Sequence, residues 1–255
     1  MYTITKVVAN LKYIKAILTV EDAVIVDLAY DTRKVYAGGG SLFFALTNQR
    51  DGHIFIAEAY AKGVRNFVVS KLDIDISNFP ESNFVWVEEP LFALQELATF
   101  HRNQFTFPII GITGSNGKTM VKEWLFELLS PEYACFQSPK SYNSQLGVPL
   151  SLWKLSTDFN IAIIEAGISR PGEMEYLANM IQPTLGIFTS LGTAHREGFS
   201  SKAEKLSEKW KLFATATSIV VPSASVLQRG FADDRLISWG YEANDFVKVI
   251  SLTNR

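Results

Sequence analysis

The sequence predicts an α/β fold in two parts: a small N-terminal α/β domain, then a larger domain with a doubly wound, mostly parallel sheet. Two observations carry this prediction. From Phe107 onward, apolar segments alternate with helical segments, which is typical of strands buried on both faces of a parallel sheet. A glycine-rich loop also joins the first of these apolar segments to a helix. Such sheets bind ligands beyond the carboxyl ends of their strands, so we expect the functional residues at that edge.

The predicted N-terminal domain covers residues 1–84, where short strand-like and helix-like segments alternate. Residues that suit strands fill three segments, 23–30, 41–46 and 66–71. Residues 54–63 are a predicted helix that ends at Gly63, a plausible C-cap. The polar, proline-containing segment 72–83 is interpreted as a possible linker, and 84–89 as a strand at the junction.

The predicted second domain covers residues 85–255. It opens with a helix at 90–105, whose proline stands at the start, where a missing N–H costs little. Apolar strands are predicted at 107–113, 133–138, 160–167, 184–190 and 218–223. Helices are predicted at 118–129, 171–181 and 203–216. Helices between successive strands are the arrangement that parallel strands require.

Composition limits the classes of partner. The chain has 255 residues with 24 Lys and Arg against 26 Asp and Glu, a net charge of −2. A nearly neutral chain has no global attraction to nucleic acid or to acidic membranes, so we expect neither as a partner. Cys135 is the only cysteine, which excludes an intrachain disulfide. With no apolar run long enough for a span and no signal-peptide pattern at the N-terminus, we expect a cytoplasmic protein.

The glycine-rich loop runs from Gly111 to Thr119 and predicts an ATP-binding phosphate loop. Its glycines let backbone N–H groups approach phosphate oxygens, and the following helix adds partial positive charge at its N-terminus. Lys118 is predicted to reach the β- and γ-phosphates, and the Thr119 hydroxyl to bind Mg²⁺. The predicted nucleotide-binding residues are Gly114, Ser115, Asn116, Gly117, Lys118 and Thr119.

The loop departs from the general phosphate-loop pattern at position 112, where isoleucine replaces glycine, and its glycines fall at 111, 114 and 117. This variant, G-x-T-G-x-N-G-K-T, resembles the Mur ligases and the folylpolyglutamate synthetases. The resemblance implies an enzyme that joins a carboxylate to an amine through an acyl phosphate, with ATP and Mg²⁺ as cofactors.

Further segments resemble the Mur ligases, and especially the branch that adds D-alanyl-D-alanine to UDP-N-acetylmuramoyl-tripeptide. Their order along the chain strengthens the resemblance. The resemblance implies those two molecules as substrates. The sequences of several segments are also similar to those of ligases that are fused to an alanine racemase. The segments are Asp31-Thr32-Arg33, Leu42 to Leu46, Asp51-Gly52-His53, Ser141 to Leu150, Glu165-Ala166-Gly167, Pro171 to Met174 and Thr189 to His195.

The resemblance also implies roles for single residues around the phosphates. Glu165 is a hard oxygen ligand for Mg²⁺ at a strand end. His195 resembles the family's ligand for a second Mg²⁺, and a carbamylated lysine follows that histidine by fourteen residues. Here that position is Lys209, predicted as catalytic together with Lys118 and His195, while Lys205 and Lys211 are nearby competitors. A carbamate requires a neutral amine, and so a lowered lysine pKa.

Asp31, Thr32, Arg33 and Asn143 resemble substrate-binding residues, the first three in a UDP-sugar domain. Ser144 and Ser190 stand where the family commonly has asparagine, so neither is given a contact. The resemblance further implies that adenine contacts and much of the amine site follow residue 255, which would make this chain alone a weak or inactive catalyst. The alternatives are another Mur ligase, a folylpolyglutamate synthetase, or a catalytically silent module that binds a nucleotide or a UDP-sugar.

Overall fold

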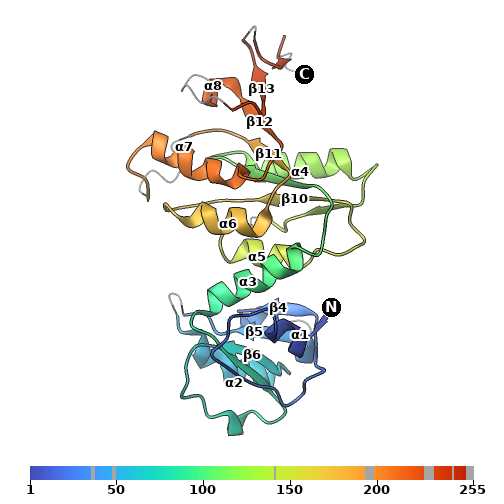
Figure 1. The fold of residues 1–255 in the computed structure, drawn as a ribbon, viewed down its shortest axis with the longest axis vertical. Helices are drawn as coiled ribbons and strands as arrows, with labels where there is room; N and C mark the ends of the chain where they lie inside the picture. The colour runs from blue at the N-terminus through green and yellow to red at the C-terminus, as the bar shows by residue number, and fades with distance from the viewer. Residues whose placement is uncertain are drawn as a thin grey trace. The chain divides into compact units, whose positions relative to one another are not determined.

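The computed structural model describes residues 1–35, 38–47, 50–140, 142–192, 198–226, 233–242 and 244–250. They form a mixed α/β structure (Figure 1). None of the helices found in these residues is both long and apolar enough to cross a bilayer.

The chain divides into two compact units, residues 1–101 and 102–255. The boundary expected after residue 84 falls inside strand β7 (Asn83–Trp86), whereas the two units divide in the last turn of helix α3 (Pro90–Arg102), after His101. Contacts at both ends of the first unit explain why α3 belongs to it. The Tyr2 hydroxyl lies 2.8 Å from His101 Nδ1, and the backbone N–H of Lys12 donates to Glu96.

The first unit contains a five-stranded sheet in the order β2-β7-β6-β5-β4, in which only the β2–β7 pair is antiparallel. Its strands are β2 (Lys15–Ile17), β4 (Asp27–Ala29), β5 (Ser41–Phe44), β6 (Asn66–Val69) and β7. A separate antiparallel pair joins β1 (Tyr2–Thr3) to β3 (Val24–Ile25), and the helices are α1 (Ile4–Val8), α2 (Ile56–Ala61) and α3. The 23–30 segment therefore forms two short strands rather than one.

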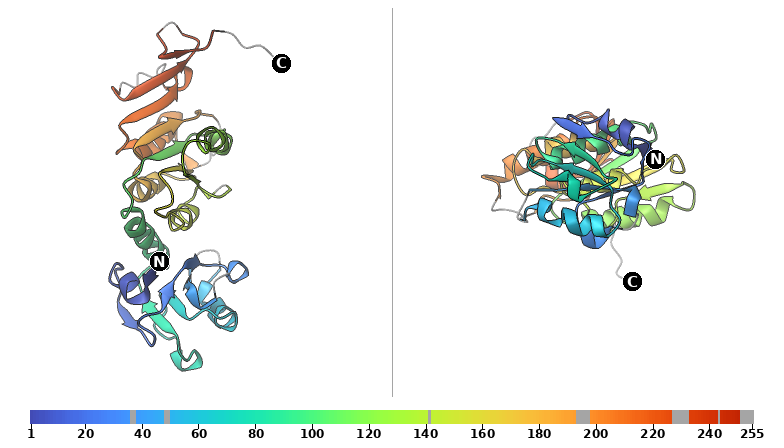
Figure 2. Two further views of the ribbon diagram at one scale, coloured as in Figure 1. Left: turned by 90° about the vertical axis from the view of Figure 1, so that its right-hand side faces the viewer. Right: turned by 90° about the horizontal axis from the view of Figure 1, so that it is seen from below.

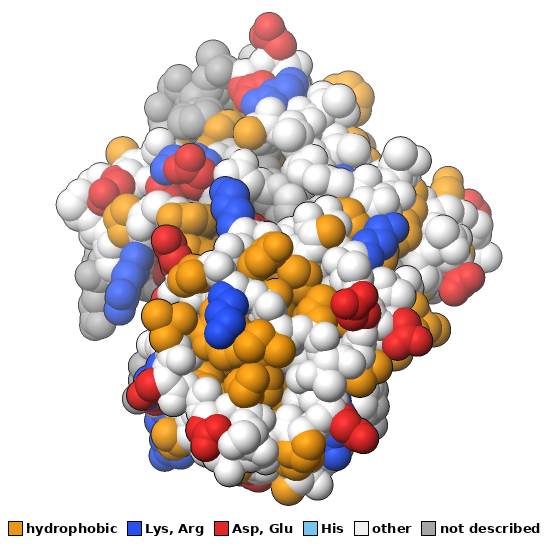
Figure 3. All heavy atoms as spheres, turned by 60° about the horizontal axis from the view of Figure 1, so that its bottom comes forward, with side chains coloured by type: hydrophobic (Ala, Val, Ile, Leu, Met, Phe, Trp, Pro, Cys, Tyr) orange, Lys and Arg blue, Asp and Glu red, His pale blue; other side chains and the backbone are white. Residues whose placement is uncertain are grey.

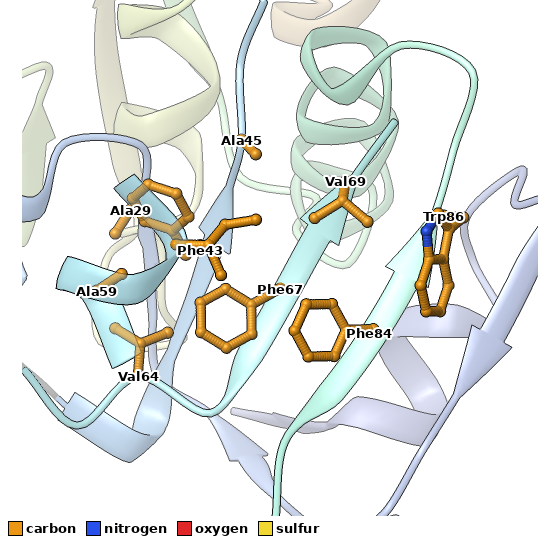
Figure 4. Packing of buried hydrophobic residues seen from close by; sticks show 10 residues of the cluster. Ala29, Phe43, Ala45, Ala59, Val64, Phe67, Val69, Phe84 and Trp86 are labelled. Carbon is orange, nitrogen blue, oxygen red and sulfur yellow. The ribbon is translucent and has the colours of Figure 1, made fainter. Parts of the chain in front are cut away.

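Aromatic rings fill the core of this unit (Figure 4). Phe67 and Phe84 are stacked with ring centroids 4.9 Å apart, and Phe43 meets Phe67 edge to face. The interpretation of 72–83 as a linker is wrong, because Phe79 from this segment packs against both stacked rings. The apolar residues of the segment are held by the first unit's core, so the segment is a loop of that unit.

Some hydrophobic side chains of the first unit also lie at its surface, and Figure 3 shows hydrophobic side chains gathered on the face that it draws. Ile14, Ile54 and Leu72 are all more than half exposed. Exposed apolar atoms are common on folded proteins, and we assign no role to these residues.

The second unit contains a seven-stranded, fully parallel sheet in the order β14-β13-β12-β11-β8-β10-β9, as the sequence predicts for this part of the chain. The strands are β8 (Ile109–Thr113), β9 (Cys135–Gln137), β10 (Ile161–Glu165), β11 (Leu185–Phe188), β12 (Ser218–Pro222), β13 (Leu236–Gly240) and β14 (Val247–Lys248). All residues of β8 and β10 are buried, which explains why their sequences are continuously apolar.

Helices pack on both sides of this sheet (Figures 1 and 2). Helix α4 (Lys118–Leu129) contacts β8, β9 and β10, whereas α6 (Glu173–Ile181) contacts α5 (Gly147–Leu152) and α7 (Lys202–Trp210). A short helix, α8 (Ser223–Val226), follows β12. Helix α4 has the bounds that the sequence predicts, whereas the short α5 has no counterpart among the predicted helices.

The strand order places a switch point at β8. The chain continues from β8 to β9 and β10 on one side of it, and then to β11 and the later strands on the other. Loops after β8, β10 and β11 therefore leave the same edge of the sheet at adjacent positions. In open parallel sheets this is where ligands bind.

Phe67→Ala tests the role of the aromatic core in the first unit. We expect the free energy of unfolding of that unit to fall by about 3–5 kcal/mol, because a fully buried ring is replaced by a cavity. Chemical unfolding followed by fluorescence measures the loss. Leu72→Ala, at a side chain that is mostly exposed, is the control and should change stability by less than about 0.5 kcal/mol. Equal effects of the two changes would contradict this description of the core.

Candidate nucleotide and metal site

The loop between β8 and α4 has the backbone of an anion-binding turn. Gly114 and Gly117 have positive φ angles of 143° and 82°, which glycine adopts without steric cost. Gly117 is the N-cap of α4 and has no side chain to accept hydrogen bonds from the first helical N–H groups. Those groups, with the helix dipole behind them, are available to a phosphate.

The loop after β11 braces the phosphate loop. The Ser115 N–H donates to the Ser190 carbonyl at 2.8 Å, and the Thr189 hydroxyl donates to the Asn116 carbonyl at 2.6 Å. A Cβ at Gly114 would collide with the Thr189 hydroxyl, so this close approach also requires glycine. Ser190, to which sequence comparison gave no contact, therefore supports the phosphate loop through its backbone and its hydroxyl.

Glu165 ends β10 with a carboxylate that is almost completely buried, its residue being 1% exposed. The Thr119 hydroxyl donates to one carboxylate oxygen at 2.7 Å, and the Asn143 amide donates to the other at 2.6 Å. Both of these donors are neutral. A buried carboxylate is costly without a cation, so this pair of oxygens is suited to receive one.

These residues fit a Mg²⁺ ion bound together with a nucleotide. The Thr119 hydroxyl and the Glu165 carboxylate supply hard oxygen atoms, the ligands that Mg²⁺ prefers, and phosphates complete its coordination in phosphate-loop proteins. Among the described residues, no three His, Cys, Asp or Glu side chains gather into a metal-binding group. His195, the expected ligand for a second metal ion, lies outside the described residues.

Two lysines converge on the phosphate loop. Lys118 Nζ lies 3.3 Å from the Gly114 carbonyl oxygen, and Lys209 Nζ lies 3.0 Å from the same atom. Lys209 is 1% exposed, and burial lowers the pKa of its amine to about 7, with smaller contributions from the positive charges of Lys118 and Lys205. A substantial fraction of the Lys209 amine is therefore neutral near pH 7, which is the form that reacts with CO₂.

The competing lysines differ from Lys209 in their surroundings. Lys205 is buried, donates to the Gly192 carbonyl at 3.2 Å and lines a hollow of about 240 Å³ beside Phe199. Lys211 is half exposed, and its ion pair with Glu208 raises the pKa of its amine. Lys209, by contrast, donates to the Gly114 carbonyl within the phosphate loop itself.

Glu208 fixes helix α7, and with it the neighbouring Lys209. One of its oxygens accepts from the N–H groups of Gly172 at 2.7 Å and Met174 at 3.2 Å, at the start of α6. The other oxygen pairs with Lys211 at 2.7 Å. A carboxylate at a helix N-terminus satisfies free N–H groups and the helix dipole together. None of the motifs found in the sequence includes Glu208, so the sequence analysis did not predict these contacts.

In the first unit, the three predicted UDP-sugar residues have partners within the protein. Asp31 accepts from the Arg33 backbone and pairs with its guanidinium through two hydrogen bonds, which lower the pKa of the Asp31 carboxyl. The Thr32 hydroxyl donates to Glu58 at 2.7 Å. The Arg33 side chain remains 84% exposed, so it is accessible to a ligand from solvent.

Lys122 is a further site residue that sequence analysis missed. It lies in α4, is 1% exposed, and donates to the carbonyls of Ser138 and Lys140 in the loop after β9. Helical spacing could have indicated that Lys122 is buried, because it lies on the same helix face as Leu125 and Leu129, which pack against the core.

The strand, the glycine-rich loop and the helix, with a hydroxyl and a carboxylate meeting at the switch point, define a phosphate-loop nucleotide-binding domain. A family profile described as the Mur ligase middle domain matches residues 112–245, more than half of the chain. The chain belongs to the Mur ligase family.

Within this family, the chain is similar to curated ligases of one name. The chain is 34% identical over 233 residues to the UDP-N-acetylmuramoyl-tripeptide–D-alanyl-D-alanine ligase of Synechocystis, covering 88% of this chain and 50% of that protein. It is 34% identical over 186 residues to the ligase of the same name from Escherichia coli, covering 72% and 39%. The chain thus spans about half the length of the curated relatives it matches, or less.

Solved structures agree with the fold. A MurF structure from Acinetobacter baumannii matches with a TM-score of 0.75 and 28% identity, over 85% of this chain and 48% of that one. A MurF ligase from Thermotoga maritima in complex with ADP matches with a TM-score of 0.75 and 25% identity, over 87% and 52%. The predicted α/β fold and the predicted Mur ligase resemblance are both confirmed. The roles of individual site residues stay predictions.

Lys209→Met tests the buried amine through the pH dependence of stability. The folded-state pKa near 7 lies below the usual value of 10.5, so between these values the unfolded chain binds more protons. Stability from this group therefore rises with pH by about 1.4 kcal/mol per pH unit across that window. We expect Lys209→Met to be stabilising relative to wild type below pH 7, and this advantage to disappear as pH approaches 10.

Chemical unfolding between pH 6 and pH 10 measures the difference. Lys154→Met, which makes the same change at an exposed lysine of the second unit, is the control and should give a difference that does not vary with pH. A difference for Lys209→Met that is equally flat would show that the amine is not held in its neutral form.

Proposed function

We propose that this chain supplies the nucleotide-binding and UDP-sugar-binding parts of an ATP-dependent ligase. The ligase joins D-alanyl-D-alanine to UDP-N-acetylmuramoyl-tripeptide, a step of peptidoglycan precursor synthesis. The carrying observation is the hydrogen bond between the Thr119 hydroxyl and the buried Glu165 carboxylate beneath the phosphate loop. Membership of the Mur ligase family and the names of the curated relatives support the choice of substrates.

The proposed reaction has three steps. The tripeptide carboxylate attacks the γ-phosphorus of ATP, so that an acyl phosphate forms and ADP leaves. The amine of D-alanyl-D-alanine then attacks the acyl carbon and forms a tetrahedral intermediate. Loss of a proton from nitrogen and departure of phosphate complete the amide bond.

The chain's own residues assist by neutralising charge and fixing positions. The backbone of the phosphate loop and the Lys118 ammonium hold the β- and γ-phosphates. Thr119 and Glu165 would hold Mg²⁺, whose positive charge would offset the repulsion between the carboxylate and the phosphate. Lys209, as a carbamate, and His195 would hold a second Mg²⁺. A carbamate replaces a positive charge by an anionic oxygen ligand, which balances the charge of two metal ions.

The first unit is the proposed UDP-sugar domain. Arg33 is the one residue of the Asp31-Thr32-Arg33 motif whose side chain is mostly exposed, so it is the one we assign to a charged contact with the substrate. Asp31 holds the guanidinium through two hydrogen bonds, which limits the conformations open to Arg33 before binding. Thr32 has a structural part in this assignment, since its hydroxyl is tied to Glu58.

Lys118→Ala tests the nucleotide site. We expect the affinity for Mg·ATP to fall roughly 10- to 100-fold, because a charge-assisted contact contributes about 1.5–3 kcal/mol. Titration calorimetry on this chain measures the affinity, with Lys154→Ala as a control that should bind as wild type does. Equal affinities of wild type and Lys118→Ala, at matched folding, would remove the basis of the proposed function.

The carbamate assignment is tested in the complete ligase with ¹³C-labelled bicarbonate. We expect wild type to show a carbamate carbon resonance by NMR, and Lys209→Ala to lose both this resonance and ligation while it retains much of its ATP binding. Acetate should restore part of the lost activity by occupying the place of the carbamate. Lys205→Ala and Lys211→Ala should retain the resonance, and its loss in Lys211→Ala alone would show that the wrong lysine has been assigned.

A further inference from the structure

Lys122 is a buried cation in the second turn of α4, four residues after Lys118. Its ammonium donates to the Ser138 carbonyl at 2.8 Å and to the Lys140 carbonyl at 2.7 Å, and the Glu123 carboxylate is 4.0 Å away. An ammonium that is almost fully buried has a large desolvation cost, so these two short contacts must compensate for it. Lys122 thus connects the phosphate-loop helix to the segment after β9.

The second acceptor lies in an unusual backbone conformation. Lys140 has a φ of 47°, in the left-handed region that residues other than glycine, asparagine and aspartate rarely adopt. Its side chain is exposed, so side-chain packing does not impose this conformation. Two hydrogen bonds support it: the Tyr142 N–H donates to the Pro139 carbonyl at 3.1 Å across the turn, and the Lys122 ammonium donates to the Lys140 carbonyl at 2.7 Å.

The segment after β9 also makes hydrogen bonds to Glu165, the proposed metal ligand. The Ser138 hydroxyl accepts from the Glu165 backbone N–H at 3.3 Å, and the Asn143 amide donates to Glu165 Oε1 at 2.6 Å. The Asn143 carbonyl also accepts from the Gly167 N–H at 2.8 Å. Residues on both sides of Lys140 therefore contact Glu165, Ser138 at its backbone N–H and Asn143 at its carboxylate.

We propose that Lys122 is a positioning residue for Glu165. It holds the Ser138–Lys140 backbone in the left-handed turn that brings the Asn143 amide onto the carboxylate. Glu165 then presents its other oxygen toward Thr119, where the proposed function places Mg²⁺. Lys122 itself touches neither the metal ion nor the nucleotide. The inference rests on the proposed function for the identity of the metal ion, and on the contacts of this chain for everything else.

The role requires lysine at this position. Its ammonium carries three donors, of which two reach separate carbonyls, and its flexible stem crosses from the helix to the loop. A methionine would fill the same space but leave both carbonyls without that donor. The Lys140 turn would then keep the Tyr142–Pro139 backbone hydrogen bond but lose the charge-assisted contact that helps to offset its unfavourable φ. Partners of metal ligands typically change metal affinity 10- to 100-fold when they are removed.

Lys122→Met is the first test, with nucleotide binding measured in the presence and absence of Mg²⁺. We expect the Mg²⁺ concentration needed to saturate the ADP complex to rise about tenfold, while ADP affinity in EDTA stays within about twofold. Lys154→Met makes the same change at an exposed lysine and should behave as wild type. A general loss of structure would instead weaken ADP binding with and without Mg²⁺ to the same extent.

Lys140 provides a second test that does not disturb the buried site. Lys140→Gly and Lys140→Val both remove an exposed charge, but only glycine adopts positive φ readily. We expect Lys140→Val to need about tenfold more Mg²⁺ and Lys140→Gly to match wild type. In the double variant Lys122→Met with Lys140→Gly, part of the Mg²⁺ dependence should return, because the turn then needs less support.

The outcomes separate this inference from the proposed function. If wild type does not bind ADP more tightly with Mg²⁺, the proposed metal site is wrong. If wild type does so but Lys122→Met needs no more Mg²⁺, or if glycine and valine at 140 behave alike, the positioning role of Lys122 is wrong and the proposed function stands.

Discussion

The buried carboxylate of Glu165 sets the main physical constraint on the second unit. It lies at the end of an all-buried central strand, and its two oxygens receive hydrogen bonds from two neutral donors, Thr119 and Asn143. A charge in that position is costly unless a cation joins it. The phosphate loop lies beside it, with Lys118 and Lys209 directed at the Gly114 carbonyl. Opposite charges thus surround the place where phosphates and a metal ion would neutralise each other.

The architecture that creates this arrangement could be predicted from the sequence. Apolar runs gave strands β8 to β12, helix α4 was predicted with its observed bounds, and the motif itself predicted the anion-binding loop. The parallel order of the strands then brings Glu165 and the phosphate loop to one edge, as expected from their positions after apolar segments. The family resemblance indicates Lys209 through its spacing from His195, and the structure adds the burial and the lowered amine pKa that its proposed chemistry needs.

The contacts that support the site could not be predicted in this way, because they join segments that are distant in sequence through backbone atoms. Ser190 reaches the phosphate loop, Glu208 caps the start of α6, and Lys122 holds Lys140 in a left-handed turn. Backbone carbonyls and N–H groups have no signature in a sequence. The interpretation of 72–83 as a linker is wrong for a related reason. The polar composition of the segment suggests a linker, but a few apolar residues such as Phe79 pack against the core of the first unit.

The position of the metal ion is the central test of the proposed site. A crystal structure of this chain with ADP and Mn²⁺ in place of Mg²⁺ would locate the ion by its anomalous scattering. We expect one strong peak between the Thr119 hydroxyl and the Glu165 carboxylate, with the ADP phosphates on the loop from Gly114 to Gly117. If the nucleotide binds at that loop but the metal ion lies elsewhere, and Thr119 still donates to Glu165, the proposal that these two residues bind the metal ion is wrong.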